Sequence, residues 1–199
     1  MSPGTAHAAP SPVRVAFQGE PAAFGEEAIR HLFGSRARPV PCHGFADVRA
    51  AILSGEADCG VLPIENTIAG TVAEAAAIVR SPALQVVGDV VRPIRQCLIG
   101  VPGATLARLG LVRSHPIALA QCTRFLAAHP GVRVVVDSDT AGAARAIAAA
   151  RDPAQAAIAG HAAAQRYGLA ILVEGIQDRA DNRTRFVVVR RREVAAPLS

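Results

Sequence analysis

Residues 175–186 read G-I-Q-D-R-A-D-N-R-T-R-F and lead directly into the apolar run V-V-V at 187–189. The first part is rich in turn-forming residues, and the second has the β-branched character of a strand buried inside a sheet. The sequence therefore predicts a polar loop that delivers Asn182, Thr184 and Arg185 to the mouth of a rigid strand.

These residue types suit an anionic ligand. Thr184 offers one orientable O–H, and Arg185 offers a planar fork of N–H donors that matches a carboxylate. Taken alone, the motif is better explained by a threonine that favours strands and a solvated arginine at a strand end, because short motifs recur by chance. The interpretation therefore depends on the rest of the chain.

The composition describes a globular protein. With 199 residues, 51% of them hydrophobic, the chain is long enough for one large domain or two small lobes. No apolar run approaches the roughly 20 residues that span a bilayer. Residues 1–12 lack the basic and apolar regions of a secretion signal. We therefore expect a disordered leader at 1–12 and a cytoplasmic protein that does not bind membranes.

The charge pattern excludes several function classes. The net charge is +5, and all 21 basic residues are Arg, so a lysine Schiff base or a lysine anchor for pyridoxal phosphate is excluded. The arginines are scattered and aromatic residues make up only 4%, which argues against nucleic-acid binding. The four cysteines (Cys42, Cys59, Cys97 and Cys122) lie far apart without metal-ligand spacing. We expect reduced thiols and no metal site.

Strand and helix patterns alternate along the chain, which indicates an α/β fold in which each lobe is a mostly parallel sheet flanked by helices. Pro93 breaks the pattern, and the chain crosses to a second lobe there and returns near Glu174. We therefore expect lobe 1 at 13–92 and 175–190, lobe 2 at 93–174, a tail at 191–199, and a cleft between the lobes. The predicted helices span 24–33, 46–53, 71–79, 116–129, 140–149 and 161–167.

Polar residues follow the predicted strands at the points where helices begin. Ligands of such folds lie at the carboxyl ends of the strands, where helix N-termini supply free N–H donors and a positive dipole. Each residue also has a structural explanation, since Ser114 and Thr140 are good helix caps and His115 is an ordinary turn residue. Their shared location is what favours a pocket for carboxylates. The residues are Gln18, Glu65, Asn66, Thr67, Ser114, His115, Thr140 and His161.

Five motifs in order give the chain a family resemblance. They are V-A-F-Q-G-E-P-A-A-F (15–24), G-V-L-P-I-E-N-T-I-A-G-T-V (60–72), S-H-P-I-A-L-A-Q-C (114–122), D-T-A-G-A-A (139–144) and G-I-Q-D-R-A-D-N-R-T-R-F (175–186). Together they resemble the catalytic domain of prephenate dehydratases and of their arogenate dehydratase relatives, over nearly everything from Val13 to Arg190. The fold of that family is similar to the two-lobed periplasmic binding proteins of type 2.

The resemblance implies loss of water and carbon dioxide from prephenate, giving phenylpyruvate for phenylalanine biosynthesis, with no metal or redox cofactor. It implies that Thr184 hydrogen-bonds or protonates the departing hydroxyl, while Arg185 pairs with a substrate carboxylate or orders the loop. It also implies a homodimer. The remaining substrate-binding residues would be Asn66, Thr67, Ser114, His115, Gln121, Thr140 and Asn182, with Glu65 positioning its neighbours.

The sequence departs from the family pattern at four places. Ala22 stands where relatives commonly have Gly, and Gly25 and Gly160 stand where they have Ser. These changes put substrate choice in doubt more than the reaction class. Residues 187–199 are too few for the regulatory ACT domain that usually binds phenylalanine, so we expect feedback inhibition through that domain to be absent.

Three alternatives stay open at this point. The substrate could be arogenate instead of prephenate. The chain could also be a non-aromatising prephenate decarboxylase, although such relatives tend to lose the T-R-F triplet at 184–186. Finally, a two-lobed fold can serve as a non-catalytic binding module for a small anion, because a fold alone does not decide function.

Overall fold

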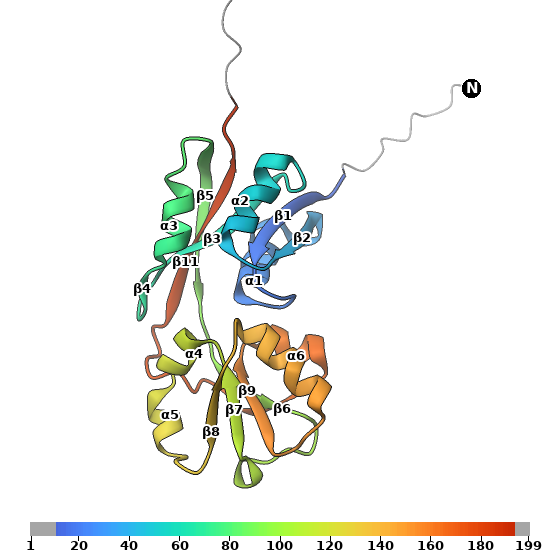
Figure 1. Cartoon of the computed structure of the whole chain (residues 1–199), viewed down its shortest axis with the longest axis vertical. Helices are drawn as coiled ribbons and strands as arrows, with labels where there is room; N and C mark the ends of the chain where they lie inside the picture. The colour runs from blue at the N-terminus through green and yellow to red at the C-terminus, as the bar shows by residue number, and fades with distance from the viewer. Residues whose placement is uncertain (1–10, 194–199) are drawn as a thin grey trace, which may run out of the picture.

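The computed structural model describes residues 11–193, which form two lobes joined by two crossing segments (Figure 1). The leader expected at 1–12 lies outside the described residues except for its last two positions, and so does the tail from residue 194 onward. Six strands build the sheet of lobe 1: Val13–Gln18 (β1), Ala37–Cys42 (β2), Cys59–Asn66 (β3), Gly70–Thr71 (β4), Leu84–Pro93 (β5) and Arg183–Arg191 (β11).

Lobe 1 folds around apolar side chains that its strands and helices bury on facing surfaces. Val15, Phe17 and Val61 of the sheet pack with Ile29 of the first helix, and all four side chains are fully buried. Burial of such side chains is the main favourable term in folding, at about 1.5–3 kcal/mol each. The helices of this lobe are Phe24–Phe33 (α1), Phe45–Ser54 (α2) and Ala73–Val79 (α3), with a 3₁₀ turn at Gly34–Arg36 (η1).

Lobe 2 has its own sheet and four helices. Where the helix Thr140–Ala150 (α6) covers this sheet, the core contains small side chains such as Ala143, Ala157 and Ala159, so the helix lies close to the sheet. The strands are Cys97–Gly100 (β6), Leu111–Ser114 (β7), Arg133–Val136 (β8), Gln155–Ala159 (β9) and Ala170–Val173 (β10). The helices are Pro116–Ala120 (α4), Thr123–Ala127 (α5), Thr140–Ala150 (α6) and His161–Tyr167 (α7), with a 3₁₀ turn at Leu106–Arg108 (η2).

Both sheets are mixed: most of their strands run in one direction, as expected, and a few are reversed. Their orders are β2-β1-β3-β11-β5, with β4 beside β3, and β10-β6-β9-β7-β8. In lobe 1, β11 and the short β4 run against the other strands, and in lobe 2, β6 runs against the other strands. The reason is the path of the chain between the lobes. β6 and β11 each arrive from the other lobe and therefore start at the edge where the parallel strands end, so they must run in the opposite direction.

The helix expected at 116–129 is two helices, α4 and α5, with a break at Gln121 and Cys122. The carboxylate of Asp178, on the second crossing segment, accepts hydrogen bonds from the backbone N–H groups of Thr123 and Arg124, each at 3.0 Å. It therefore caps α5 as a separate helix. This cap lies more than 50 residues away in the chain, and for that reason the local sequence pattern does not reveal the break.

Two further findings concern the chain between residues 11 and 193. None of its helices combines the length and the apolar character needed to cross a membrane. The four cysteines are free thiols, three of them buried. Burial raises the pKa of Cys59 to about 11 and that of Cys122 to about 12, so both stay protonated and unreactive near neutral pH.

Candidate active site

A cavity of about 440 Å³ lies between the lobes and is lined by side chains of both. Lobe 1 contributes polar groups that follow its strands, and lobe 2 contributes groups from the starts of α4 and α6 together with the first crossing segment. This is the place where the parallel strands of both lobes end, as expected for a two-lobed α/β fold. The polar lining residues are Gln18, His43, Asn66, Glu74, Gln96, His115, Gln121, Ser138, Asp139, Thr140 and Thr184.

Three longer helices begin at this cavity. Gly25 of α1, Phe45 of α2 and Thr140 of α6 all line it, each within the first turn of its helix. The first N–H groups of a helix have no partner inside the helix and carry the positive end of its dipole. No side chain caps α1, so its first N–H groups are available to a carboxylate of a ligand.

Thr184 presents its hydroxyl to the cavity. Side chains alternate along β11, so that Thr184 and Phe186 line the cavity while Arg185 is exposed on the other face. Thr184 is only 7% exposed, and its Oγ1 accepts a hydrogen bond from Asn66 Nδ2 at 2.9 Å. Within residues 11–193 the hydroxyl has no acceptor for its own proton. It is therefore oriented as an acceptor toward Asn66 and free to donate to a ligand.

A network of side-chain amides holds Asn66 in place. Asn66 Oδ1 accepts from the backbone N–H groups of Ile68 and Ala69, each at 2.9 Å, and its Nδ2 donates to Asn182 Oδ1 at 2.9 Å. Gln121 closes the network by accepting from Asn182 Nδ2 at 3.0 Å and donating to Asn66 Oδ1 at 3.2 Å. Buried networks in which each group finds a partner rigidify a site.

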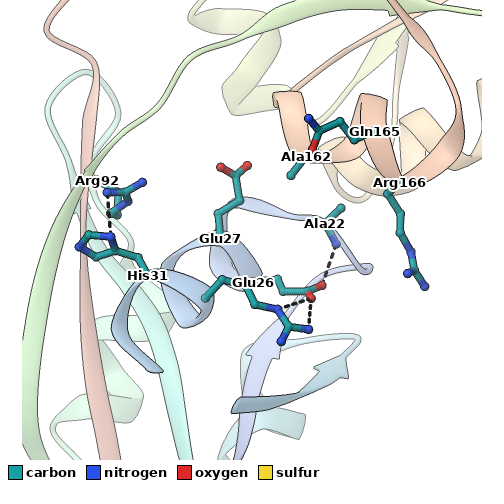
Figure 2. A pocket seen from close by; sticks show the side chains of 9 residues that line it. Ala22, Glu26, Glu27, His31, Arg92, Ala162, Gln165 and Arg166 are labelled. Atoms are coloured by element: carbon teal, nitrogen blue, oxygen red, sulfur yellow. Dashed lines mark hydrogen bonds and ion pairs between the residues drawn. The ribbon is translucent and has the colours of Figure 1, made fainter. Parts of the chain in front are cut away.

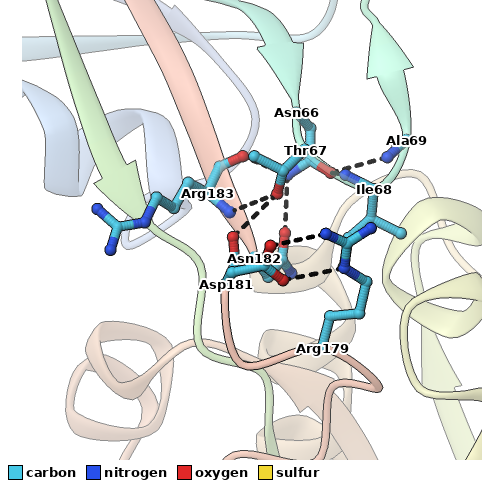
Figure 3. Close-up of polar contacts among 8 residues, drawn as sticks. All are labelled: Asn66, Thr67, Ile68, Ala69, Arg179, Asp181, Asn182 and Arg183. Atoms are coloured by element: carbon cyan, nitrogen blue, oxygen red, sulfur yellow. Dashed lines mark hydrogen bonds and ion pairs between the residues drawn. The ribbon is translucent and has the colours of Figure 1, made fainter.

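The loop before β11 is tied to the end of β3 by Thr67, as Figure 3 shows. Thr67 Oγ1 donates to the carbonyl of Asp181 at 3.1 Å and accepts from the N–H of Arg183 at 3.0 Å. An ion pair between Arg179 and Asp181 at 2.6 Å stiffens the same loop. Thr67 is itself exposed and does not line the cavity, so its contacts position the loop that carries Asn182 and Thr184.

Arg185 and Glu65 lie away from the cavity wall. Arg185 forms an ion pair with Asp89 of β5 at 2.8 Å, and both side chains are about half exposed. Glu65 is exposed and pairs along the backbone with Thr71 of β4 and with Arg185. The resemblance implied that Arg185 pairs with a substrate carboxylate or orders the loop; its placement away from the cavity, paired with Asp89, favours a structural role.

The structure thus divides the expected site residues into two groups. Ser114 is fully buried behind the cavity, where its Oγ donates to the carbonyl of Ile158 at 2.6 Å. His161 is exposed and pairs with Glu174 at 3.1 Å. On the cavity wall are Asn66, His115, Gln121, Thr140 and Thr184, and off it are Glu65, Thr67, Ser114, Asn182 and Arg185.

His43 and Gln96 are among the polar lining residues that were missed in the sequence. His43 follows β2 and precedes α2, so the rule that found the other strand-end residues would also have found it. Gln96 precedes β6 instead of following a strand. A strand that arrives from the other lobe starts at the cleft, so its polar residue comes before it. A rule that considers only residues after strands therefore does not find it.

His115 is neutral near pH 7. Burial lowers its pKa, and its Nδ1 accepts from the N–H of Ile117 at 3.2 Å, which caps α4. It therefore offers the cavity an uncharged imidazole.

In residues 11–193 no group of three or more His, Cys, Asp or Glu side chains is placed to hold a metal ion.

A second cavity, of about 660 Å³, lies between α1 and α7 (Figure 2). None of the expected site residues lines it. Its most notable group is Glu27, whose Oε1 is buried without a hydrogen-bond partner within the described residues. Burial raises the pKa of Glu27, partly offset by the positive charge of Arg92. Arg92 itself contacts the His31 ring at 3.3 Å.

The family model described as prephenate dehydratase matches residues 15–194. The chain belongs to the prephenate dehydratase family. This finding confirms the resemblance that the five motifs indicated. Among curated relatives of this prephenate dehydratase domain, a bifunctional N-acyl-homoserine lactone acylase/prephenate dehydratase from Komagataeibacter europaeus is 36% identical over 92% of the chain and 64% of the relative. Arogenate dehydratase 3 from Arabidopsis thaliana is 40% identical over 98% of the chain and 45% of the relative.

A solved structure agrees in fold. The prephenate dehydratase from Arthrobacter aurescens, determined in complex with L-Phe, has a TM-score of 0.82 and 31% identity over 94% of the chain and 63% of that structure. The prephenate dehydratase domain described here therefore spans between about half and two thirds of the length of these relatives. The expected two-lobed α/β fold is confirmed, with mixed sheets.

Proposed function

We propose that this chain catalyses the decarboxylative dehydration of prephenate, or of its amino analogue arogenate, to phenylpyruvate or phenylalanine. The observation that carries the proposal is the hydroxyl of Thr184, which lines the cavity, accepts from Asn66 and keeps its own proton free. Membership of the prephenate dehydratase family supports the reaction class. Arogenate comes into the proposal because several relatives carry the name arogenate dehydratase.

The chemistry needs little more than positioning and one proton donor. The bond between the ring and the carboxylate breaks, carbon dioxide leaves, and the electron pair of that bond moves into the ring. The ring becomes aromatic as the C–O bond to the hydroxyl breaks. The departing oxygen gains negative charge, which the O–H of Thr184 stabilises by donating a hydrogen bond. One proton from solvent completes the water molecule.

The helix N-termini would hold the carboxylates. The start of α1 is uncapped and faces the cavity, and the cavity lining includes no arginine. Backbone N–H groups at helix starts bind anions without a basic side chain. This assigns carboxylate binding to the backbone, and leaves Arg185 to pair with Asp89.

Product identification tests the reaction class. Purified protein is incubated separately with prephenate and arogenate, and the products are identified by mass spectrometry. Phenylpyruvate from prephenate, or phenylalanine from arogenate, supports the proposal. A non-aromatic dihydro acid would indicate the decarboxylase alternative, and binding without any product would indicate the binding-module alternative. Either of these results would overturn the dehydratase.

Thr184→Val tests the residue that carries the proposal. Valine keeps the shape of threonine and removes the hydroxyl, and Asn66 Nδ2 keeps its other acceptors, Asn182 Oδ1 and the carbonyl of Arg183. We expect kcat to fall about 10²-fold or more, with KM less affected, because the lost contact forms mainly in the transition state. Thr184→Ser, which keeps the hydroxyl, is the matched control and should retain most of the activity. Near-normal turnover by Thr184→Val would remove this hydroxyl from the mechanism.

A homodimer and a cytoplasmic location complete the proposal. The homodimer rests on the family resemblance. Size-exclusion chromatography with light scattering would determine the oligomeric state.

A further inference from the structure

The orientation of every amide in the cavity network is determined by two backbone groups. Asn66 Oδ1 accepts from the N–H groups of Ile68 and Ala69, and a backbone N–H can only donate (Figure 3). The oxygen of Asn66 must therefore face this turn. Its Nδ2 must face Asn182 and Thr184, where it acts as the donor.

This orientation passes from one amide to the next. Because Asn66 donates to Asn182 Oδ1, the other end of Asn182 is a donor, and it donates to Gln121 Oε1 at 3.0 Å. Gln121 Nε2 then faces Asn66 Oδ1 at 3.2 Å, as the first step requires. Gln121 Oε1 also receives the Nε2 of Gln96 at 3.1 Å. If the Gln96 amide were reversed, its oxygen would face the oxygen of Gln121, which is repulsive.

The oxygen of Gln96 is the acceptor left over at the end of this chain of amides. Gln96 is 2% exposed, lines the cavity, and has no hydrogen-bond donor for Oε1 among the described residues. A buried carbonyl without a donor is unfavourable, so a ligand that brings a donor to this point is favoured over one that does not. Along the network, Asn66, Asn182 and Gln121 separate this acceptor from the free donor of Thr184.

The charge of the cavity indicates which donor belongs there. Its ionisable lining residues are His43, Glu74, His115 and Asp139, with no arginine among them, so the carboxylates outnumber the fixed positive charges. A ligand whose charge includes an ammonium group is less repelled than one whose ionised groups are all anionic. Prephenate and arogenate differ in this respect, because the keto group of the first is an ammonium group in the second.

We propose that Gln96 is a specificity-determining residue whose Oε1 accepts a hydrogen bond from the ammonium group of the substrate, so that the cavity prefers arogenate to prephenate. The oxygen of the ring hydroxyl accepts from the O–H of Thr184 in this arrangement. The inference rests on the proposed function and deepens it by naming the substrate.

Steady-state kinetics with both substrates test this inference. For the unchanged protein we expect kcat/KM to be at least about 10-fold higher with arogenate. Gln96→Met removes the acceptor at similar length, and it should reduce kcat/KM for arogenate about 10- to 100-fold, mainly through KM, because hydrogen bonds to charged groups are strong. The value for prephenate should change less than about threefold. Gln165→Met, on an exposed position of α7, is the control for the same chemical change.

A second variant and a binding measurement keep the test decisive. Gln96→Glu keeps an acceptor at the position of Oε1, but its second oxygen replaces the donor to Gln121 Oε1 and should lower activity with both substrates. The preference for arogenate over prephenate should nevertheless be retained. Calorimetric binding of both compounds to Thr184→Val measures affinity without turnover, so it remains informative if neither compound reacts and the proposed function fails. Equal losses for the two substrates in Gln96→Met, or tighter binding of prephenate by the unmodified Gln96 site, would overturn the role of Gln96.

Discussion

Ala22 adopts a left-handed backbone conformation, with a φ of 71°, which non-glycine residues rarely do. It stands where the family resemblance leads us to expect glycine. The conformation costs an alanine about 1–2 kcal/mol, whereas glycine loses only about 0.5–1 kcal/mol in chain entropy. We therefore expect Ala22→Gly to raise the free energy of unfolding by up to about 1 kcal/mol, measured by urea denaturation.

The neighbouring alanine provides the control for this substitution. Ala23 has an ordinary φ of −67° and is buried, so Ala23→Gly should lower the free energy of unfolding. A stabilising effect of both substitutions, or of neither, would show that backbone strain at Ala22 is not the cause.

At the scale of single residues, the sequence indicated which residues line the cavity where their position directly after a strand was enough to place them. Asn66, His115 and Thr140 follow parallel strands, and the structure brings all three to the cavity. Arg185 was expected to pair with a substrate carboxylate or to order the loop, and the alternation of side chains along β11 turns it to the exposed face, where it pairs with Asp89. The alternation itself was readable from the strand pattern, since Thr184 and its neighbour must face opposite sides of the sheet.

At the scale of elements, the pair Arg185–Asp89 joins β11 to β5 across the outer face of the lobe 1 sheet. If the arginine only orders this pair of strands, Arg185→Gln and Asp89→Asn should have matching effects. Exposed ion pairs contribute little stability. We therefore expect either variant to lower the melting temperature by at most a few degrees and to change KM less than about threefold.

Kinetics and thermal unfolding of the two single variants and the double variant distinguish a structural role of Arg185 from a role in substrate binding. A double variant no worse than either single one indicates that the residues act only through each other. A rise of KM by about 10-fold or more in Arg185→Gln, with Asp89→Asn unchanged, would contradict this prediction and return Arg185 to substrate binding.

Element types and the direction of most strands were predictable from the sequence, and the reversed direction of β6 and β11 was not. The helices α1 and α7 have the bounds expected from their apolar periodicity. The antiparallel placement of β6 and β11 depends on which end of the strand meets the cleft, which only the path between the lobes determines. The separate start of α5 likewise depends on Asp178, which reaches Thr123 from a distant segment.

At the scale of the whole molecule, the two crossings of the chain produce both cavities between the lobes, yet only one was expected. The second cavity forms where α1 of lobe 1 meets α7 of lobe 2 (Figure 2). A Cβ on Gly160, which precedes α7, would lie 3.0 Å from Glu27 Oε1 and from the Phe24 ring. The glycine at this position, where relatives commonly have serine, thus leaves room for the two lobe 1 side chains.

The buried carboxylate of Glu27 makes the stability of the two-lobed structure depend on pH. Burial raises its pKa in the folded protein, so the folded state binds a proton at pH values where the unfolded chain has released it. Stability therefore falls as the pH rises from the unfolded pKa, near 4.5, through the raised folded pKa. Above that range Glu27 is ionised in both the folded and the unfolded state, and the cost of burying its charge lowers the stability by the full amount.

The Glu27→Gln substitution should remove this loss of stability at higher pH. We expect the variant to melt a few degrees higher than the parent protein at pH 8, and the difference to shrink toward pH 4, where Glu27 is protonated. Differential scanning fluorimetry from pH 4 to pH 8 measures both. Glu26→Gln is the matched control, since Glu26 binds Arg30 at 3.0 Å and the N–H of Ala22 at 2.9 Å, so its loss should destabilise. A lower melting temperature of Glu27→Gln at pH 8 would mean that the ionised carboxylate stabilises the contact between the lobes.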